Sequence, residues 1–261
     1  MNTLVFDIET VPDVELGRRL YELGDLDDAG VAKAMFAKQR QARQTDFLPP
    51  PLQRVVAISI VMRTGDGLKI FSLGDEKSSE RELVQRFYDG LERYTPTLVS
   101  WNGSGFDLPV LTYRALRHGI DAHRYWEVGE SDREFRFNNY LSRYHWRHVD
   151  LMDVLAGYGA SGRASLEVVA QLVGLPGKLG IGGAQVWSSY QRGELAAIRD
   201  YCEADVLNTY LIYLRWELTR GDLDAAGYER EIKVVETKLE QSGKPHLTQY
   251  LALWRATRHG R

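Results

Sequence analysis

The chain has 261 residues, of which 44% are hydrophobic and 26% are charged, and its formal net charge is −3. This composition is ordinary for a globular protein, and the net charge excludes a strongly basic nucleic-acid binder. No apolar run approaches the roughly 20 residues of a membrane-spanning helix, so no membrane partner is expected.

The N-terminal apolar run is short and ends in carboxylates, so it is not expected to be a signal peptide. A single cysteine, Cys202, excludes an internal disulfide. Together these features favour a cytoplasmic protein. The length and the absence of a linker predict one domain over residues 1–261.

The first predicted element is a short buried strand, formed by Leu4-Val5-Phe6. Asp7 and Glu9 follow it, and because side chains alternate along a strand, both should point to the same face. Two carboxylates side by side at the end of a buried strand repel each other unless a cation lies between them. Oxygen ligands favour Mg²⁺ or Mn²⁺ over Zn²⁺. A solvated strand end without a metal is the alternative.

Residues 13–50 contain no apolar strand and are predicted to be a helical insertion in the main fold. Helical spacing covers 13–24 and 29–44, and Pro49-Pro50-Pro51 ends the segment. We expect the insertion either to cover the substrate or to pack on the outside.

Strands and helices then follow each other, with a hairpin at 64–67 and C-terminal helices within 222–261. The strands are predicted over 54–62, 68–73 and 97–101, and the helices over 79–94, 108–118, 165–173, 186–191, 194–220, 228–241 and 248–257.

Three other stretches have weaker patterns. Residues 119–147 interleave arginines with aromatic rings, which suits a single-stranded nucleic-acid surface, and an irregular loop with inward rings is the alternative. Asp150 is assigned as the N-cap of a short helix with Asp153 in its first turn, and both are left out of the site. The glycine-rich loop 174–183 lacks the spacing of a Walker loop, but its Lys178 is a candidate phosphate contact.

Two later stretches carry further carboxylates. The stretch Asn102–Asp107 follows a predicted strand, where α/β sheets place their ligands. Its Asp107 is either a third metal ligand or a helix N-cap. Tyr201 and Asp205 are four residues apart, so they share a helical face that is predicted to be partly buried. A buried Asp205 needs a partner, and an ordinary salt bridge is the alternative to a metal. Cys202 is predicted to be packed in the core and unreactive.

In type and order, the stretches Phe6–Thr10, Asn102–Asp107 and Tyr201–Asp205 resemble the three motifs of the DEDDy 3′–5′ exonucleases. The chain is similar to the stand-alone predicted bacterial exonucleases related to the proofreading domain of family B DNA polymerases. The resemblance implies an RNase H-like α/β fold, in which helices flank a mixed central sheet. It is carried by the segments FDIETVPD, HVDLMDVLAGYG, LPGKLGIGG and YCEADVLNTY.

The resemblance also implies a role for each motif residue. Asp7, Glu9 and Asp205 would hold one divalent cation, Mg²⁺ or Mn²⁺. Asp7 would bridge to a second cation, which Asp107 would reach directly or through water. Two such cations can clamp the attacking and leaving oxygens of a phosphodiester displacement. Tyr201 would position the attacking water, and nucleoside 5′-monophosphates would be released.

The expected substrate is single-stranded nucleic acid, with DNA favoured over RNA. Thr10 and Asn102 are candidate substrate contacts, and Trp101 and Phe106 are candidate base-stacking rings with core packing as the alternative. An exoribonuclease or oligonucleotidase with the same chemistry is the rival enzyme. A non-catalytic nucleic-acid-binding module on this fold is the rival from another class, and the complete set of four carboxylates with Tyr201 argues against it.

Overall fold

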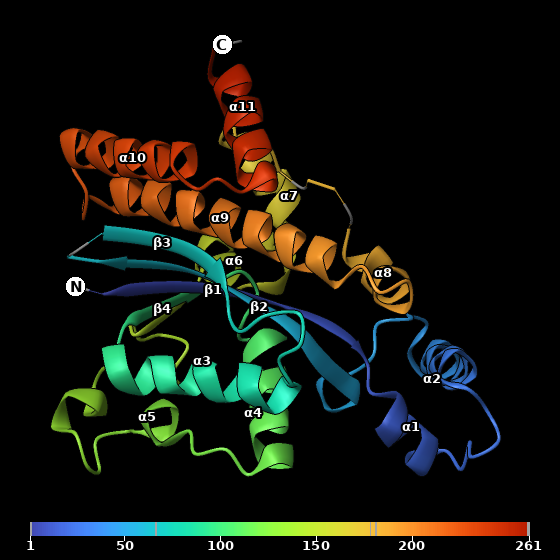
Figure 1. The fold of residues 1–261 in the computed structure, drawn as a ribbon. Coiled ribbons are helices and arrows are strands. Elements are labelled where there is room, and N and C mark those ends of the chain that lie inside the picture. Colours follow the sequence, from blue (N-terminus) through green and yellow to red (C-terminus); the bar gives the residue numbers. More distant parts are fainter. Residues whose placement is uncertain (1, 66, 178, 181, 260–261) are drawn as a thin grey trace.

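The computed structural model describes residues 2–65, 67–177, 179–180 and 182–259, and it places helices on both faces of a five-stranded sheet (Figure 1). The strand order is β3-β2-β1-β4-β5. β2 runs antiparallel to β1 and β3, whereas β4 and β5 run parallel to β1, so the sheet is mixed. The strands are β1 (Thr3–Pro12), β2 (Gln53–Thr64), β3 (Gly67–Ser72), β4 (Thr97–Ser100) and β5 (His148–Asp150).

Two hydrophobic cores lie on the two faces of the sheet. The face seen uppermost in Figure 1 packs against α7 (Leu166–Leu172), α9 (Leu195–Arg220), α10 (Ala225–Glu240) and α11 (Pro245–His259). The opposite face packs against α3 (Glu80–Tyr94), α4 (Asp107–His118) and α5 (His123–Trp126). The predicted α/β architecture, a mixed central sheet flanked by helices, is therefore confirmed.

The central strand β1 is longer than the sequence predicted. Leu4, Phe6 and Ile8 point into the core below the sheet, whereas Val5 points into the core beneath α9. This alternation continues beyond Phe6, so the strand extends to Pro12 with a register shift after Glu9. The expectation that the first two carboxylates close the strand is therefore wrong, because they lie within it.

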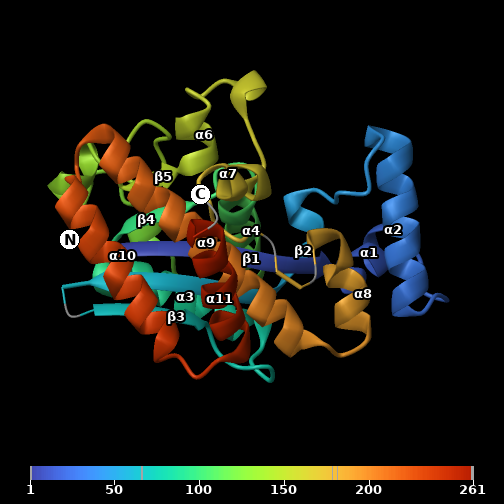
Figure 2. The same cartoon turned by 90° about the horizontal axis from the view of Figure 1, so that it is seen from above.

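The predicted helical insertion is confirmed. β1 and β2 are antiparallel neighbours, but instead of a tight turn they are joined by α1 (Val14–Leu20) and α2 (Asp28–Arg43). Asp13 and Asp27 begin these helices, since each side chain accepts a backbone N–H of the first turn. Both α2 and the neighbouring α8 (Val186–Gln191) lie beyond the end of the sheet where β1 ends (Figure 2).

The predicted helices are confirmed with shifts of a few residues at their ends, and α9 runs from Leu195 to Arg220. The sequence did not predict β5, which has three residues and is followed at once by α6 (Leu151–Leu155). The irregular segment before β5 contains only short helical turns. Among the described helices, none combines the length and the apolar character needed to cross a membrane.

Candidate active site

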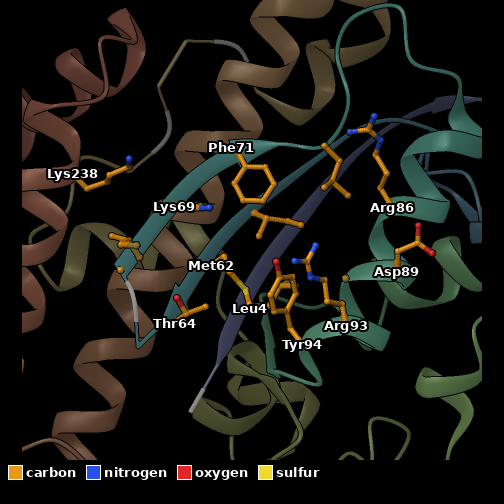
Figure 3. Close-up of a pocket in the computed structure, with 15 residues that line it drawn as sticks. Leu4, Met62, Thr64, Lys69, Phe71, Arg86, Asp89, Arg93, Tyr94 and Lys238 are labelled. Atoms are coloured by element: carbon orange, nitrogen blue, oxygen red, sulfur yellow. The ribbon is translucent and has the colours of Figure 1, made fainter.

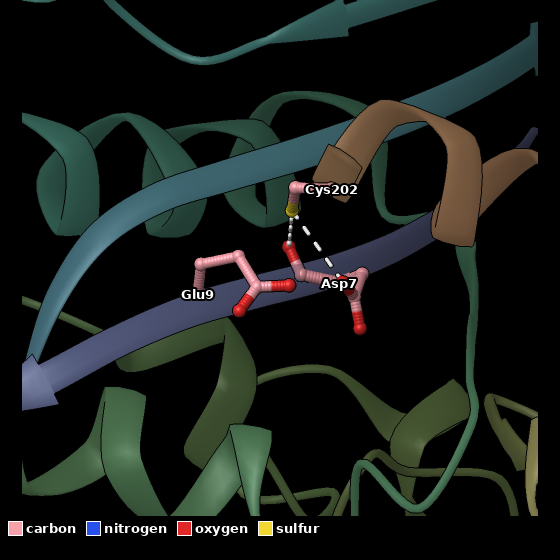
Figure 4. Close-up of side chains that lie close together, drawn as sticks. All are labelled: Asp7, Glu9 and Cys202. Atoms are coloured by element: carbon pink, nitrogen blue, oxygen red, sulfur yellow. Dashed lines mark hydrogen bonds between the residues drawn. The ribbon is translucent and has the colours of Figure 1, made fainter. Parts of the chain in front are cut away.

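Asp7 and Glu9 form the base of the site and project from β1 on the side that α9 covers (Figure 4). One carboxylate oxygen of each and the sulfur of Cys202 all lie within 4.8 Å of one another. The prediction that the two carboxylates share a face of the strand is therefore confirmed. Ile8 between them points the other way, into the core.

Asp107 reaches the same strand from α4. Its Oδ1 accepts the backbone N–H of Ile8 at 3.2 Å. β4 pairs with β1 only from Thr3 to Val5, so this edge of β1 is open further along, and Asp107 occupies it. Phe106, rather than Asp107, is the N-cap residue of α4. The N-cap alternative for Asp107 is therefore wrong.

Asp205 and Tyr201 come from the buried part of α9. They lie one helical turn apart, and the charge of Asp205 acts on the Tyr201 hydroxyl. The charges of Asp205, Glu9 and Asp7 all act on Tyr201. The three predicted motifs thus meet at one place, although they are far apart in the sequence.

The electrostatics of this cluster are unfavourable for four negative charges. Burial raises the pKa of Asp7 well above its usual value, and the charges of Asp107, Glu9 and Asp205 raise it further. Burial also raises the pKa of Asp107 to about 7. Carboxylates in such a setting either take up protons or bind a cation. The site therefore fits divalent cations with oxygen ligands.

Cys202 is a hydrogen-bond partner that the sequence analysis did not assign to the site. Its sulfur lies 3.4 Å from both the main-chain oxygen and Oδ2 of Asp7 and donates to them. Burial, and then the charges of Asp7 and Glu9, raise the pKa of this thiol, so it remains protonated and acts as a donor. Its expected packing in the core is confirmed, because its exposed fraction is 0%. Its place beside Tyr201 in the helix was the only signal in the sequence.

Asp150 also contributes more than the helix cap that was predicted. It is the N-cap of α6, as expected, and its two carboxylate oxygens also accept the N–H groups of Asn102 and Ser104 at 2.9 Å each. Asn102 has a left-handed backbone with φ of 62°, which this bond helps to hold. Gly103 is required because a Cβ there would collide with Ser100. Asp150 therefore fixes the loop that leads into Asp107.

The candidate substrate contacts have different surroundings. The hydroxyl of Thr10 donates to Gln53 at 2.9 Å. Trp101 is half-buried against the core beneath α9, in agreement with the packing alternative. Phe106 packs partly against the opposite core, and its ring lies 4.9 Å from that of Phe47. The predicted contact Lys178 lies outside the described residues.

Two large cavities are present in the described part of the chain. One, of about 600 Å³, adjoins the carboxylates because Glu9 and Thr10 form part of its wall. The other, of about 530 Å³, lies between α3 and the β2–β3 hairpin, where Phe71 and Arg93 line it (Figure 3). The described residues around this second cavity include none of the predicted site residues.

Comparison with known proteins places the chain in a family. Residues 45–254 match the family described as predicted 3′–5′ exonucleases related to the exonuclease domain of PolB. Because the match covers well over half of the chain, the protein belongs to this family of PolB-like exonuclease domains. Asp107, Tyr201 and Asp205 lie inside the matched range, and Asp7 and Glu9 precede it.

The similar curated proteins are DNA polymerases. A DNA polymerase of Archaeoglobus fulgidus is 28% identical over 171 residues, which are 64% of this chain and 21% of that protein. The catalytic subunit of DNA polymerase epsilon from Emericella nidulans is 27% identical over 53% of this chain and 6% of its own length. The chain thus spans about a fifth or less of these two relatives. The structure was also compared with a solved family B DNA polymerase from Pyrobaculum calidifontis. The superposed regions cover 97% of this chain and 27% of the polymerase chain, with 17% sequence identity and a TM-score of 0.49.

Proposed function

We propose that this protein is a metal-dependent 3′–5′ exonuclease that acts on single-stranded DNA and releases nucleoside 5′-monophosphates. One observation carries the proposal: three separate stretches bring Asp7, Glu9, Asp107 and Asp205 together with Tyr201. Family membership supports the reaction class. The raised pKa of Asp7, caused by burial and by three neighbouring carboxylates, supports a cation as the ligand of the cluster.

In this proposal Asp7, Glu9 and Asp205 would hold one divalent cation, and Asp7 would hold a second together with Asp107, directly or through water. When bound, the two cations lower the pKa of a water molecule and stabilise the negative charge that develops on the phosphate. The bond between Asp107 and the Ile8 N–H keeps one ligand against β1 before any cation arrives. The Cys202 thiol orients Asp7 in the same way from the α9 side.

Tyr201 acts as a hydrogen-bond donor in this proposal rather than as a base. Burial, followed by the charge of Asp205, raises the pKa of its hydroxyl above the usual value. The hydroxyl therefore keeps its proton at neutral pH. It can orient the attacking water or a phosphate oxygen. This role depends on where the hydroxyl lies and not on a pKa near neutral pH.

The test is a cleavage gel with a 5′-labelled single strand in Mg²⁺, Mn²⁺ or EDTA. We expect a ladder that shortens one nucleotide at a time in either metal and no cleavage in EDTA or with Asp205→Ala. An RNA strand of the same sequence and a circular single-stranded DNA serve as comparison substrates. Full activity in EDTA, or cleavage of the circle, would overturn the proposal, and faster cleavage of RNA would change the substrate to RNA.

A further inference from the structure

The cavity between α3 and the β2–β3 hairpin has an apolar floor (Figure 3). Its volume of about 530 Å³ lies within the range of about 300–1,000 Å³ that is typical of small-molecule sites. Because β3 is an edge strand, this part of the sheet has a neighbouring strand on one side only. The hydrophobic side chains of the floor belong to the core beneath the sheet or pack against it: Leu4, Ile60, Met62 and Phe71. A ligand in the cavity would therefore rest directly on the hydrophobic core.

Gly90 widens the cavity from the side of α3. Glycine inside a helix is destabilising by roughly 0.5–1 kcal/mol relative to alanine. The chain itself does not require a glycine here, because the backbone is helical without a positive φ. A Cβ at this position would meet only Leu4, at 3.9 Å, which is ordinary van der Waals contact. Gly90 therefore leaves space in the cavity that the packing of the chain does not need.

Cationic side chains from three elements surround the cavity. They are Lys69 of β3, Arg86 and Arg93 of α3, and Lys238 of α10. Figure 3 shows Lys69 on one side and the two arginines on the other. Arg86 is paired with Glu82 at 2.7 Å. Within the part of the chain that the structure describes, no ion pair engages Lys69, Arg93 or Lys238. The rim of the cavity is therefore positively charged, and three of its cations are available to a ligand.

The charge of this cavity is opposite to that of the cavity beside the candidate active site. Asp89 is the only carboxylate among its described lining residues, and it already accepts from the Gln85 amide at 2.8 Å. In the other cavity, Glu9 and Asp46 both line the wall. An apolar floor below a cationic rim favours a ligand that combines an apolar body with a negative charge, because the floor buries the body and the rim donates charge-assisted hydrogen bonds.

We propose that this cavity is a binding site for a small amphipathic anion, a molecule with an aromatic or aliphatic body and a phosphate or carboxylate group. The body contacts Phe71 and Met62, and the anionic group faces Lys69 and Arg93. Leu4 of the floor and Asp7 point to opposite faces of the sheet, so this site is separate from the carboxylate cluster. The inference does not depend on the exonuclease proposal. Nucleoside monophosphates and aliphatic carboxylates both have the required chemistry.

The test is a fluorescence titration in EDTA with 8-anilinonaphthalene-1-sulfonate, an aromatic anion. We expect one dye molecule to bind per protein. Lys69→Glu, at an exposed position of β3, should weaken binding by about 10-fold or more, as the loss of one hydrogen bond to a charged group predicts. Gly90→Leu should abolish binding because it fills the cavity, and a thermal melt checks that this variant is folded.

Two control variants should bind the dye as the wild type does. Lys33→Glu makes the same change of charge at an exposed position of α2, away from the residues that line the cavity. Phe47→Ser removes an exposed ring that lines the cavity beside Glu9. Unchanged dye binding in both Lys69→Glu and Gly90→Leu, or weakened binding in Phe47→Ser alone, would overturn the inference.

Displacement of the dye from the wild type then distinguishes the two sources of the anion. Deoxyadenosine monophosphate is compared with deoxyadenosine, and octanoate is compared with octanol. We expect the anion of at least one pair to displace the dye at a concentration at least about 10-fold lower than its neutral counterpart, since only the anion gains the hydrogen bonds to the cations. Equal displacement by the charged and neutral members of both pairs, or displacement by none of them, would overturn the inference.

Discussion

The protein buries carboxylates in two regions and surrounds them in opposite ways. Beneath the insertion, the guanidinium of Arg114 bonds to both Asp13 and Glu80, and all three side chains are at most 6% exposed. Burial alone would raise the pKa of Asp13, but bonds from Leu16 and Arg114 lower it. In the candidate active site, the strongest charge effects on Asp7 come from other carboxylates, and its pKa is raised.

The same contrast occurs within one helix. Glu203 and Asp205 are two residues apart in α9 and are both buried. Glu203 bonds to Lys244 and His246, and although burial opposes it, these partners lower its pKa to about 2. Asp205 instead adds its charge to the carboxylates around Asp7. The first kind of carboxylate is paired with cationic side chains of the protein, whereas the second kind, in the proposed function, is paired with a bound cation.

The largest expected effect is on the cleavage rate of Tyr201→Phe, whose stability should stay close to that of the wild type. Tyr201→Phe removes one hydroxyl and keeps the packed ring, so Mn²⁺ affinity and the fold should change little. Cleavage should slow by about 10²–10⁴-fold, which is typical of a positioned proton-handling group. Single-turnover cleavage measured beside a thermal melt checks this. Cleavage at the wild-type rate would remove Tyr201 from the reaction.

Arg114 should show the opposite behaviour. Arg114→Met removes the cation that Asp13 and Glu80 share and leaves only the more exposed Arg117 and His118 beside them, so the free energy of unfolding should fall by up to about 3–5 kcal/mol. Urea unfolding measures the change. The control is Arg86→Met. Arg86 and its partner Glu82 are both exposed to solvent, so the free energy of unfolding should fall by no more than about 1 kcal/mol. Equal losses in the two variants would contradict the structural role given to Arg114.

Substitution of Asp107 should change the free energy of unfolding by a smaller amount, and this change should depend on pH. Its pKa in the folded protein, raised by burial to about 7, exceeds the unfolded value of about 3.9, so the folded state binds more protons between these values. In EDTA, its carboxylate should therefore cost stability progressively as the pH rises from about 4 to about 7. Asp107→Asn keeps an acceptor for the Ile8 N–H and removes this cost.

The variant should be more stable than the wild type by on the order of 1–4 kcal/mol above pH 7, and the difference should vanish near pH 4. Thermal melts across this range in EDTA measure it. Asp89→Asn, at an exposed position of α3, should show no such trend. A variant that is less stable at pH 8 would show that the carboxylate of Asp107 is not under electrostatic strain.

Local sequence patterns were sufficient for the parts of the site that lie within one element. Alternation along a strand predicted that Asp7 and Glu9 lie on one face, and helical spacing predicted that Tyr201 and Asp205 share a face of their helix. The same reasoning ended the first strand too early, because polar residues in its second half concealed the continuing alternation. The pairing with β2 extends the strand through those residues.

Contacts between distant parts of the chain could not be predicted in this way. The bond from Ile8 to Asp107 joins residues 99 positions apart, and the bond from Cys202 to Asp7 spans 195 positions. The strand β5 was missed because three residues carry too little pattern, and with it the second role of Asp150 was missed. Such contacts depend on how the elements pack, which residue spacing alone does not determine.

A calorimetric titration with Mn²⁺ distinguishes the two kinds of buried carboxylate in α9 and β1. Asp7 and Asp205 are proposed to bind cations, whereas Glu203 is paired within the protein. We expect the wild type and Glu203→Gln to bind Mn²⁺ with similar affinity, and Asp7→Asn and Asp205→Asn to bind it far more weakly while remaining folded. Absence of Mn²⁺ binding by the wild type, or unchanged binding by Asp205→Asn, would contradict the proposed cation site.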